Sequence, residues 1–578
     1  MLCFFICGQG QGASPLPDPP FREAEPTRPK WGRERVGVKY GGDLVLSSAS
    51  DPKSFNPILA KETSTTFITG MLFEGLTTTD AFTLLPKPNL AERWEMSPDG
   101  LKWTFHLRAG LRWSDGQPLK ADDVLFTFND LIFNPDIPSS SKDIYTINGQ
   151  PIRVEKVDDL TVRFVLPFKF APFLRSMGQE ILPQHILGPA VKAGKFNFTW
   201  GIDAKPDGIV GSGPFRLKRY VPGQRVELER NPNYWKRSSE GEALPYLDGV
   251  TVLIVPSLDV ELLKFLEGSA DVYGMRGMDY PLMKPQEAKR DFTIYDLGPD
   301  LGSSFVVFNQ NSGTNPKTGK PFVAPHKLAW FQDVRFRRAV AHAVDRRKII
   351  EIVKNGLGYP QYSPESPAVG YYYNDNVRKY DHDLAKSRAL LKEAGFLDRN
   401  SDGILEDKDG NPLEFNLYTN ADNTERVDIA SIIRRDLESL GMKVNFLLVE
   451  FNTLVSKLTS TYEWDAIVLG LTGSIDPHFG QNVWLSSGQL HMWYPQQKEP
   501  ATSWEKRIDE LFSLGAQELD EAKRKAHYDE FQAIIAEQVP MVYTVLGARL
   551  TAVRNKFGNM KPAPFGGVLH NLEEIYIK

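Results

Sequence analysis

The first half of the chain alternates apolar and polar residues, as half-buried strands do. Residues 101–108 read Leu-Lys-Trp-Thr-Phe-His-Leu-Arg, which places the four apolar side chains on one face of a sheet. Residues 161–165 and 225–229 show the same two-residue period. Residues 251–255 form a continuous apolar run, which is typical of a central strand. The pattern therefore predicts a strand-rich region up to about residue 305.

Beyond about residue 330 the apolar spacing lengthens to that of helices. Apolar stripes recur at three and four positions within residues 336–349, 429–440 and 528–535. Asp333 and Asp383 are placed to cap two helices of this region. Because strand-like runs lie between the helices, the pattern favours a mixed α/β lobe; these runs are residues 443–448 and 465–469.

Length and composition restrict the class of protein. The chain has 578 residues, enough for two or three domains, with 41% hydrophobic and 24% charged residues, as in globular proteins. The formal net charge of -5 gives no electrostatic case for a nucleic-acid partner. The two cysteines, Cys3 and Cys7, both lie at the N-terminus, so the body has no disulfide and no thiol nucleophile.

Residues 1–40 are expected to precede the folded body. The start is a short apolar stub without a basic segment, and we interpret it as the remnant of an export signal. Cys7 is the alternative: a lipid-attachment cysteine, although its neighbours fit that role poorly. Residues 14–30 are rich in proline and charge and are typical of an extended tether. The sequence has no apolar run long enough for a transmembrane helix.

A series of short motifs carries a family resemblance. The first block comprises residues 90–95 (Leu-Ala-Glu-Arg-Trp-Glu), 97–100 (Ser-Pro-Asp-Gly), 103–105 (Trp-Thr-Phe), 107–110 (Leu-Arg-Ala-Gly), 113–116 (Trp-Ser-Asp-Gly) and 121–124 (Ala-Asp-Asp-Val). Further blocks follow in order at 211–215 (Gly-Ser-Gly-Pro-Phe), 230–235 (Arg-Asn-Pro-Asn-Tyr-Trp), 334–346 and 385–395. Together they resemble family 5, the peptide/nickel-type extracellular solute-binding proteins of ABC transporters, over nearly the whole chain.

The resemblance implies an α/β clamp of the periplasmic-binding-protein type, with two lobes, mixed sheets and two hinge crossings. The first lobe is then discontinuous and comprises 41–76, 207–305 and 540–578. An extra inserted subdomain covers 77–206, and the second lobe covers 306–539. Residues 305–309 and 542–545 are the expected crossings. A ligand that contacts both lobes only when they close favours the closed state.

The function implied by the resemblance is capture of a peptide in the periplasm or cell envelope. We expect a monomer that delivers its cargo to an ABC permease and needs no cofactor. One alternative is the same clamp with an oligosaccharide or another solute. The other is an extracellular hydrolase, for which Asp122 and Asp123 would be paired carboxylates. The side chains of adjacent residues usually point apart, and two aspartates suit the start of a helix better than a catalytic pair. The sequence also contains no known catalytic motif, so we predict no enzymatic activity.

The resemblance also implies a ligand site in the second lobe. In peptide binders of this family, an acidic side chain that follows a Gly-Trp strand end pairs the ligand's amine. Here Leu471 replaces the tryptophan and Ser474 stands near the usual acid, so Asp476 is the nearest carboxylate. The alternative is that Asp476-Pro477 is only a turn. The other predicted ligand contacts are His478, Trp484, Asn309, Thr419, Asn420 and Asn423.

These further residues each have a structural alternative. His478 fits packing or hydrogen bonding better than metal binding, because the nine histidines show no metal-like cluster. Trp484 suits a core as well as a cleft wall. Asn309 lies on a crossing, where it would reach the ligand or tie the hinge. Thr419, Asn420 and Asn423 precede a helix, so they suit capping as well as ligand binding.

Residues 398–409 match the spacing of a calcium loop. Side-chain oxygens recur at alternate positions, and Gly403 occupies the sharp turn. Asp409 is shorter than the glutamate that usually ends such a loop, which would weaken the site. A polar turn without metal is the alternative. The predicted structural calcium ligands are Asp398, Asn400, Asp402, Ile404 through its carbonyl, Glu406 and Asp409.

Overall fold

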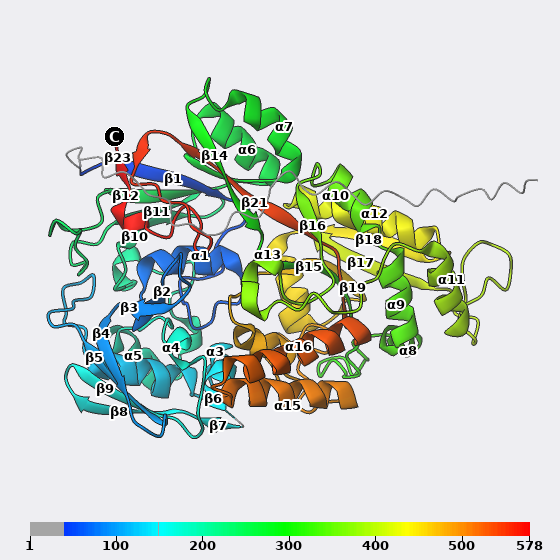
Figure 1. Ribbon diagram of the computed structural model, residues 1–578, viewed down its shortest axis with the longest axis horizontal. Coiled ribbons are helices and arrows are strands. Elements are labelled where there is room, and N and C mark those ends of the chain that lie inside the picture. The colour runs from blue at the N-terminus through cyan, green and yellow to red at the C-terminus, as the bar shows by residue number, and fades with distance from the viewer. Residues whose placement is uncertain (1–39, 148) are drawn as a thin grey trace, which may run out of the picture. The chain divides into compact units, whose positions relative to one another are not determined.

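A computed structural model describes residues 40–147 and 149–578 (Figure 1). The predicted signal remnant, tether and both cysteines therefore lie outside the described residues. A four-stranded sheet has the order β1 (Asp43–Ser48), β12 (Gly249–Ile254), β11 (Arg225–Arg230) and β10 (Phe215–Val221). The apolar run predicted as a central strand is β12, which lies between β1 and β11. Helix α1 (Thr63–Leu72) packs against β10.

A second four-stranded sheet lies entirely within the predicted inserted subdomain. Its order is β4 (Ala91–Met96), β5 (Lys102–Leu107), β9 (Thr161–Val165) and β8 (Arg153–Asp158). Phe105 and Leu107 of β5 are buried, which confirms the predicted apolar face. Two small ladders and short helices complete it: β2 (Thr77–Thr79), β3 (Pro86–Pro88), β6 (Thr146–Ile147), β7 (Gln150–Pro151), α2 (Ala121–Leu125), α3 (Ser141–Ile144), α4 (Phe173–Ser176) and α5 (Gln184–Lys192).

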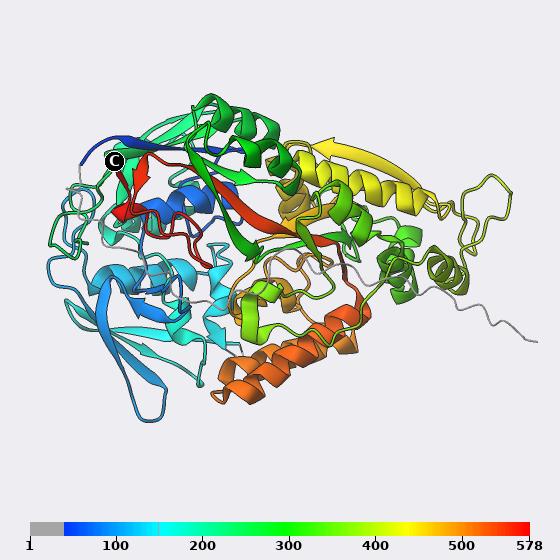
Figure 2. The ribbon, with the colours of Figure 1, turned by 45° about the horizontal axis from the view of Figure 1, so that its top comes forward.

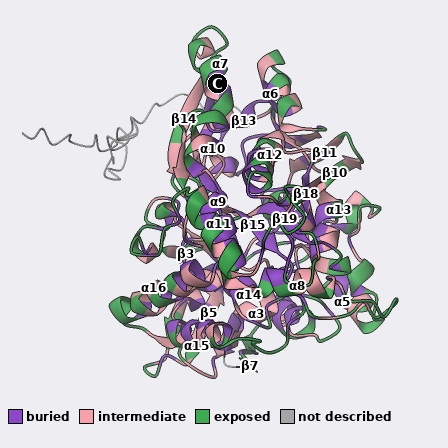
Figure 3. Ribbon diagram, turned by 90° about the vertical axis from the view of Figure 1, so that its right-hand side faces the viewer, coloured by how far each residue is buried: buried purple, intermediate pink, exposed green. Residues whose placement is uncertain are grey.

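The second-lobe sheet has five strands and a buried apolar cluster on each face; Figure 3 colours the chain by burial. Its order is β18 (Lys443–Val449), β17 (Glu414–Asn420), β19 (Ala466–Leu471), β15 (Ser303–Phe308) and β20 (Met541–Tyr543). Along β15, Phe305 and Val307 pack into one apolar cluster, whereas Val306 and Phe308 pack into another. This alternation explains why the strand is apolar at every position.

Helices cover both faces of the second-lobe sheet. Asp333 and Asp383 cap α9 and α11 through their side chains, as predicted. The helices are α8 (Pro325–Gln332), α9 (Val334–Ala343), α10 (Arg346–Ile352), α11 (Leu384–Glu393), α12 (Thr424–Glu438), α13 (Phe451–Ser456), α14 (Gln481–Trp484), α15 (Ser503–Gln517) and α16 (Glu521–Gln538). None of the helices in the described part of the chain combines the length and apolar character that crossing a membrane requires.

A fourth sheet connects the lobes at the two crossings. Strand β21 (Val545–Arg554) pairs with β13 (Val272–Met275), β14 (Phe292–Pro299) and β16 (Gly358–Pro360) (Figure 2). One crossing runs from β14 into β15, and the other runs from β20 into β21. The strand-rich prediction missed α6 (Leu258–Glu267), which Ser257 caps and Gly268 ends, and α7 (Tyr280–Met283). The chain finishes with a ladder of β22 (Phe557–Gly558) and β23 (Tyr576–Ile577).

Candidate ligand site between the lobes

Asp476 lies in the loop that follows β19, which ends at Leu471, and it is only 2% exposed. Its carboxylate accepts the backbone N–H of His478 at 3.1 Å and so begins a short 3-10 helix. Arg524 of α16 donates to both carboxylate oxygens, with Nη2–Oδ1 at 2.7 Å and Nη1–Oδ2 at 2.9 Å. Asp476 is thus both a helix cap and half of a buried bidentate ion pair.

Residues of the inserted subdomain contact the same region. Nε of Arg175 in α4 lies 4.0 Å from Oδ2 of Asp476. The backbone N–H of Ala171 donates to the carbonyl of Ala516 at 2.7 Å. The Asp143 carboxylate accepts the backbone N–H of Gln489 at 3.1 Å. The structure therefore brings the Asp476–Arg524 ion pair to the interface between the inserted subdomain and the second lobe.

The charge of Asp476 is set by two opposing effects. Burial disfavours the ionised carboxylate, but the Arg524 guanidinium outweighs burial and holds the pKa of Asp476 below its usual range. The hydroxyl of Tyr372 accepts a hydrogen bond from Arg524 at 2.5 Å, and the Tyr528 ring lies 5.2 Å from the guanidinium. Asp476 is therefore ionised at neutral pH, and whether it also contacts a ligand stays a prediction.

His478 and Trp484 are both buried. His478 is 1% exposed, and its ring packs edge-on against Phe170 of the inserted subdomain at 4.8 Å between centroids. Its ring nitrogens have no well-formed hydrogen bond among the described residues, and burial lowers its pKa to about 4. Trp484 lies in an apolar cluster of the second lobe and contacts Phe531. The structure thus gives Trp484 the core position that was one of its two interpretations.

The four predicted polar contacts of the second lobe have intramolecular partners. Asn309 follows the last residue of β15 and lies away from the observed crossing; its amide donates to the carbonyls of Tyr462 and Trp464, each at 2.9 Å, and so ties this end of β15 to the segment before β19. Asn423 caps α12 through the N–H of Arg426. Thr419 donates to the Val468 carbonyl, and Asn420 bonds Asp422 and Arg426. Ligand contact by any of the four stays a prediction.

Sequence reasoning missed residues that surround Asp476. Glu365 is 8% exposed, and its pKa rises to about 8, first because of burial and then because of the Asp476 charge. Tyr543 of β20 is buried near Glu365. Residues 365, 476, 524 and 543 are far apart in the chain, so no local spacing predicts their meeting. The one available signal for Arg524 is its position four residues before the helical stripe predicted at residues 528–535.

A hollow also opens between the lobes next to this interface. It has a volume of about 680 Å³, within the range of small-molecule sites. The first lobe contributes Lys61, and the inserted subdomain contributes Pro138. The second lobe contributes Tyr462 and His491 among others. Burial lowers the pKa of Lys61, and nearby Asp143 opposes this effect.

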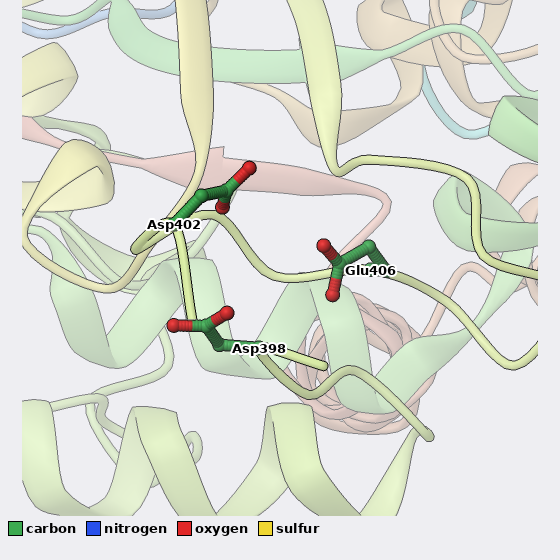
Figure 4. A group of neighbouring side chains, drawn as sticks. All are labelled: Asp398, Asp402 and Glu406. Atoms are coloured by element: carbon green, nitrogen blue, oxygen red, sulfur yellow. The ribbon is translucent and has the colours of Figure 1, made fainter. Parts of the chain in front are cut away.

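The predicted calcium loop brings three carboxylates together (Figure 4). Asp398, Asp402 and Glu406 each offer an oxygen within 4.8 Å of the others, and Glu406 is buried. Asn400 donates to Asp402 at 3.1 Å, which keeps it beside the group. Asp409 is exposed and is not part of the group. The carboxylates suit Ca²⁺, which prefers oxygen ligands, while Asp407 and Asn411 form the turn that follows.

A two-lobed α/β clamp with a charged cluster between its lobes defines a solute-binding protein. The model of the bacterial extracellular solute-binding proteins, family 5, matches residues 86–491. The chain belongs to this family, whose members bind solutes and are not enzymes. It is the solute-binding component of an ABC transporter.

Particular relatives agree with this assignment. A probable ABC transporter-binding protein of Deinococcus radiodurans is 33% identical, covering 89% of this chain and 88% of the relative. The oligopeptide-binding protein AppA of Bacillus subtilis is 30% identical, covering 87% and 86%. The solved structure of AppA with a nonapeptide has a TM-score of 0.80 and covers 94% of this chain and 100% of that chain at 28% identity. The α/β fold with mixed sheets is thereby confirmed.

Proposed function

We propose that this chain captures peptides between its two lobes and delivers them to a membrane permease. The similarity to AppA, at 30% identity over 87% of this chain, carries the proposal. The dipeptide-binding protein of Escherichia coli, at 27% identity over 93% of this chain, supports it. Peptide recognition through main-chain hydrogen bonds tolerates many side chains, so such a site serves a range of sequences.

The charges between the lobes also support a zwitterionic cargo. Glu365 is a buried carboxyl group on a segment bonded to both crossings, whereas Lys61 is a partly buried cation beside Asp143. Peptide termini carry opposite charges and require partners of both signs when they are desolvated. A neutral sugar would instead favour aromatic stacking and uncharged hydrogen bonds.

An oligosaccharide is the second candidate cargo. The periplasmic α-galactoside-binding protein of Rhizobium meliloti is 26% identical over 74% of this chain, so one relative of this family is named for a sugar. Both candidates use the same clamp, and only the chemistry between the lobes distinguishes them.

The melting temperature of the purified protein tests the two candidates. A ligand at about 100 times its dissociation constant stabilises the protein by about 2.7 kcal/mol. We expect a mixture of random short peptides to raise the melting temperature and a mixture of oligosaccharides to leave it unchanged. A rise with oligosaccharides alone would replace the peptide proposal with the sugar proposal.

A further inference from the structure

Glu365 is a buried carboxyl group without a cation. It is 8% exposed, and among the described residues no donor or cation bonds its carboxylate. The charge that acts on it is that of Asp476, which has the same sign. Glutamate is rarely buried unless it is paired, because desolvating an unpartnered charged or polar group is costly. An unpaired carboxyl here therefore requires an explanation.

The segment around Glu365 is attached to both crossings. The side-chain oxygen Oε1 of Gln361 accepts the N–H of Ser304, at the start of β15, at 3.1 Å. The N–H of Gln361 donates to the carbonyl of Thr544, in the second crossing, at 3.0 Å. Ser366 donates to the carbonyl of Asp300 at 2.5 Å. Glu365 thus lies on a segment that is bonded to residues of both crossings.

A second unpartnered polar group lies near Glu365. The hydroxyl of Tyr543 is buried and has no hydrogen-bond partner among the described residues. Burial, followed by the charge of Glu365, raises the pKa of Tyr543. A carboxylate and a hydroxyl that both lack partners offer two oxygen acceptors to a bound cation.

Asp476, by contrast, already has its cation. Arg524 bonds both of its oxygens, and the His478 N–H bonds one of them. A ligand cation at Asp476 would have to compete with Arg524, whereas at Glu365 it would pair with a carboxyl group that has no other partner. We infer that the Glu365 carboxyl receives the cationic nitrogen of the captured ligand, an ammonium or guanidinium, an inference that rests on the proposed peptide-binding function.

Proton release is a second consequence of this assignment. Burial and Asp476 raise the pKa of Glu365 to about 8, so the empty site holds this carboxyl mainly protonated at pH 7. The groups that act on Glu365 are Asp476 and Tyr543, and Asp476 is itself in contact with Arg524 and Arg175. A bound cation favours the ionised carboxylate, so binding at pH 7 releases a proton to the buffer.

The experiment uses ligand-free protein and three pools of random hexapeptides. The first pool lacks Lys and Arg and has free amino termini. The second is the same pool after N-acetylation, and the third is N-acetylated and contains Lys. Titration calorimetry in phosphate and in Tris at pH 7 measures affinity and proton release for the wild type and E365Q. E261Q is the matched control, because Glu261 is also buried with a raised pKa but bonds Ser47.

We expect the wild type and E261Q to bind the first pool about 10- to 100-fold more tightly than the second, because a charge-assisted hydrogen bond is lost on acetylation. E365Q is expected to lose this preference and the proton release. If the third pool binds as tightly as the first, and only with Glu365 present, a lysine side chain can supply the cation in place of the amino terminus. A preference that E365Q retains overturns this inference and leaves peptide binding intact. Failure of all three pools overturns peptide binding and this inference with it.

Discussion

Each carboxylate oxygen of Asp476 accepts a hydrogen bond from a different terminal nitrogen of Arg524, at 2.7 and 2.9 Å. Both side chains are buried, so the pair is shielded from solvent and salt. The carboxylate follows a central strand of the second-lobe sheet, and the guanidinium comes from the last long helix. The pair joins these elements next to the inserted subdomain, since Arg175 approaches the same carboxylate.

Breaking this pair from one side should be costly. We expect Arg524→Gln to destabilise the protein by about 3–5 kcal/mol, because Asp476 is left buried and uncompensated. The double variant Asp476→Asn, Arg524→Gln should recover part of this loss. Urea unfolding provides the free energies of unfolding for a double-mutant cycle.

The exposed pair of Arg347 and Glu351, at 2.9 Å, is the control. Replacing either residue should cost less than about 1 kcal/mol, as for other surface pairs. An equally small cost for Arg524→Gln would contradict the role assigned to the buried pair.

Acid should destabilise the protein through His478. Burial lowers its folded pKa to about 4, below the unfolded value of about 6.5. The unfolded state therefore binds more protons in this window, and stability falls as pH drops from about 6.5 to 4, by at most about 3 kcal/mol. Asp476 and Arg524 face this ring, and the Ile144 backbone lies near it.

His478→Gln should remove this part of the pH dependence. Free energies of unfolding at pH 7.5 and pH 5, measured with urea for both proteins, provide the test. Parallel pH profiles for the wild type and the variant would show that His478 does not titrate as its burial requires.

Glu365 should have the opposite pH dependence. Its folded pKa is raised to about 8, above its ordinary value of 4.5, so the folded state binds more protons between these values. Its contribution to stability is present below about pH 4.5 and is lost as pH rises to 8. We expect Glu365→Gln to stabilise the ligand-free protein at pH 8, by up to about 4 kcal/mol, and to have little effect near pH 4. Thermal unfolding at the two pH values tests this, and an equal effect at both would refute it.

Added Ca²⁺ distinguishes the two interpretations of residues 398–409, a calcium site and a polar turn without metal. If Ca²⁺ binds, it offsets the repulsion among Asp398, Asp402 and Glu406, and millimolar Ca²⁺ should raise the melting temperature. Asp402→Asn should reduce this rise, whereas Asp409→Asn should not, because Asp409 is outside the group. An unchanged melting temperature with Ca²⁺ and with EGTA would identify the loop as a plain polar turn.

Much of the secondary structure could be predicted from local patterns. The alternation in residues 101–108 correctly predicted the strand β5, and the apolar run after Gly249 correctly predicted the central strand β12. Asp333 and Asp383 cap the helices that they were expected to cap. Helix α6 was not predicted, although Ser257 and Gly268 mark its ends, because the residues around it have the apolar pattern of strands.

Local patterns were sufficient to predict the family, most of the secondary-structure elements and the position of Asp476 after a strand, because these depend on neighbours in the chain. The partners of that carboxylate depend on how distant segments fold together. Arg524, Arg175 and Glu365 reach Asp476 from distant segments, and no local spacing encodes such a meeting. Burial then set their charges, since desolvation and neighbouring charges act through space and not along the chain.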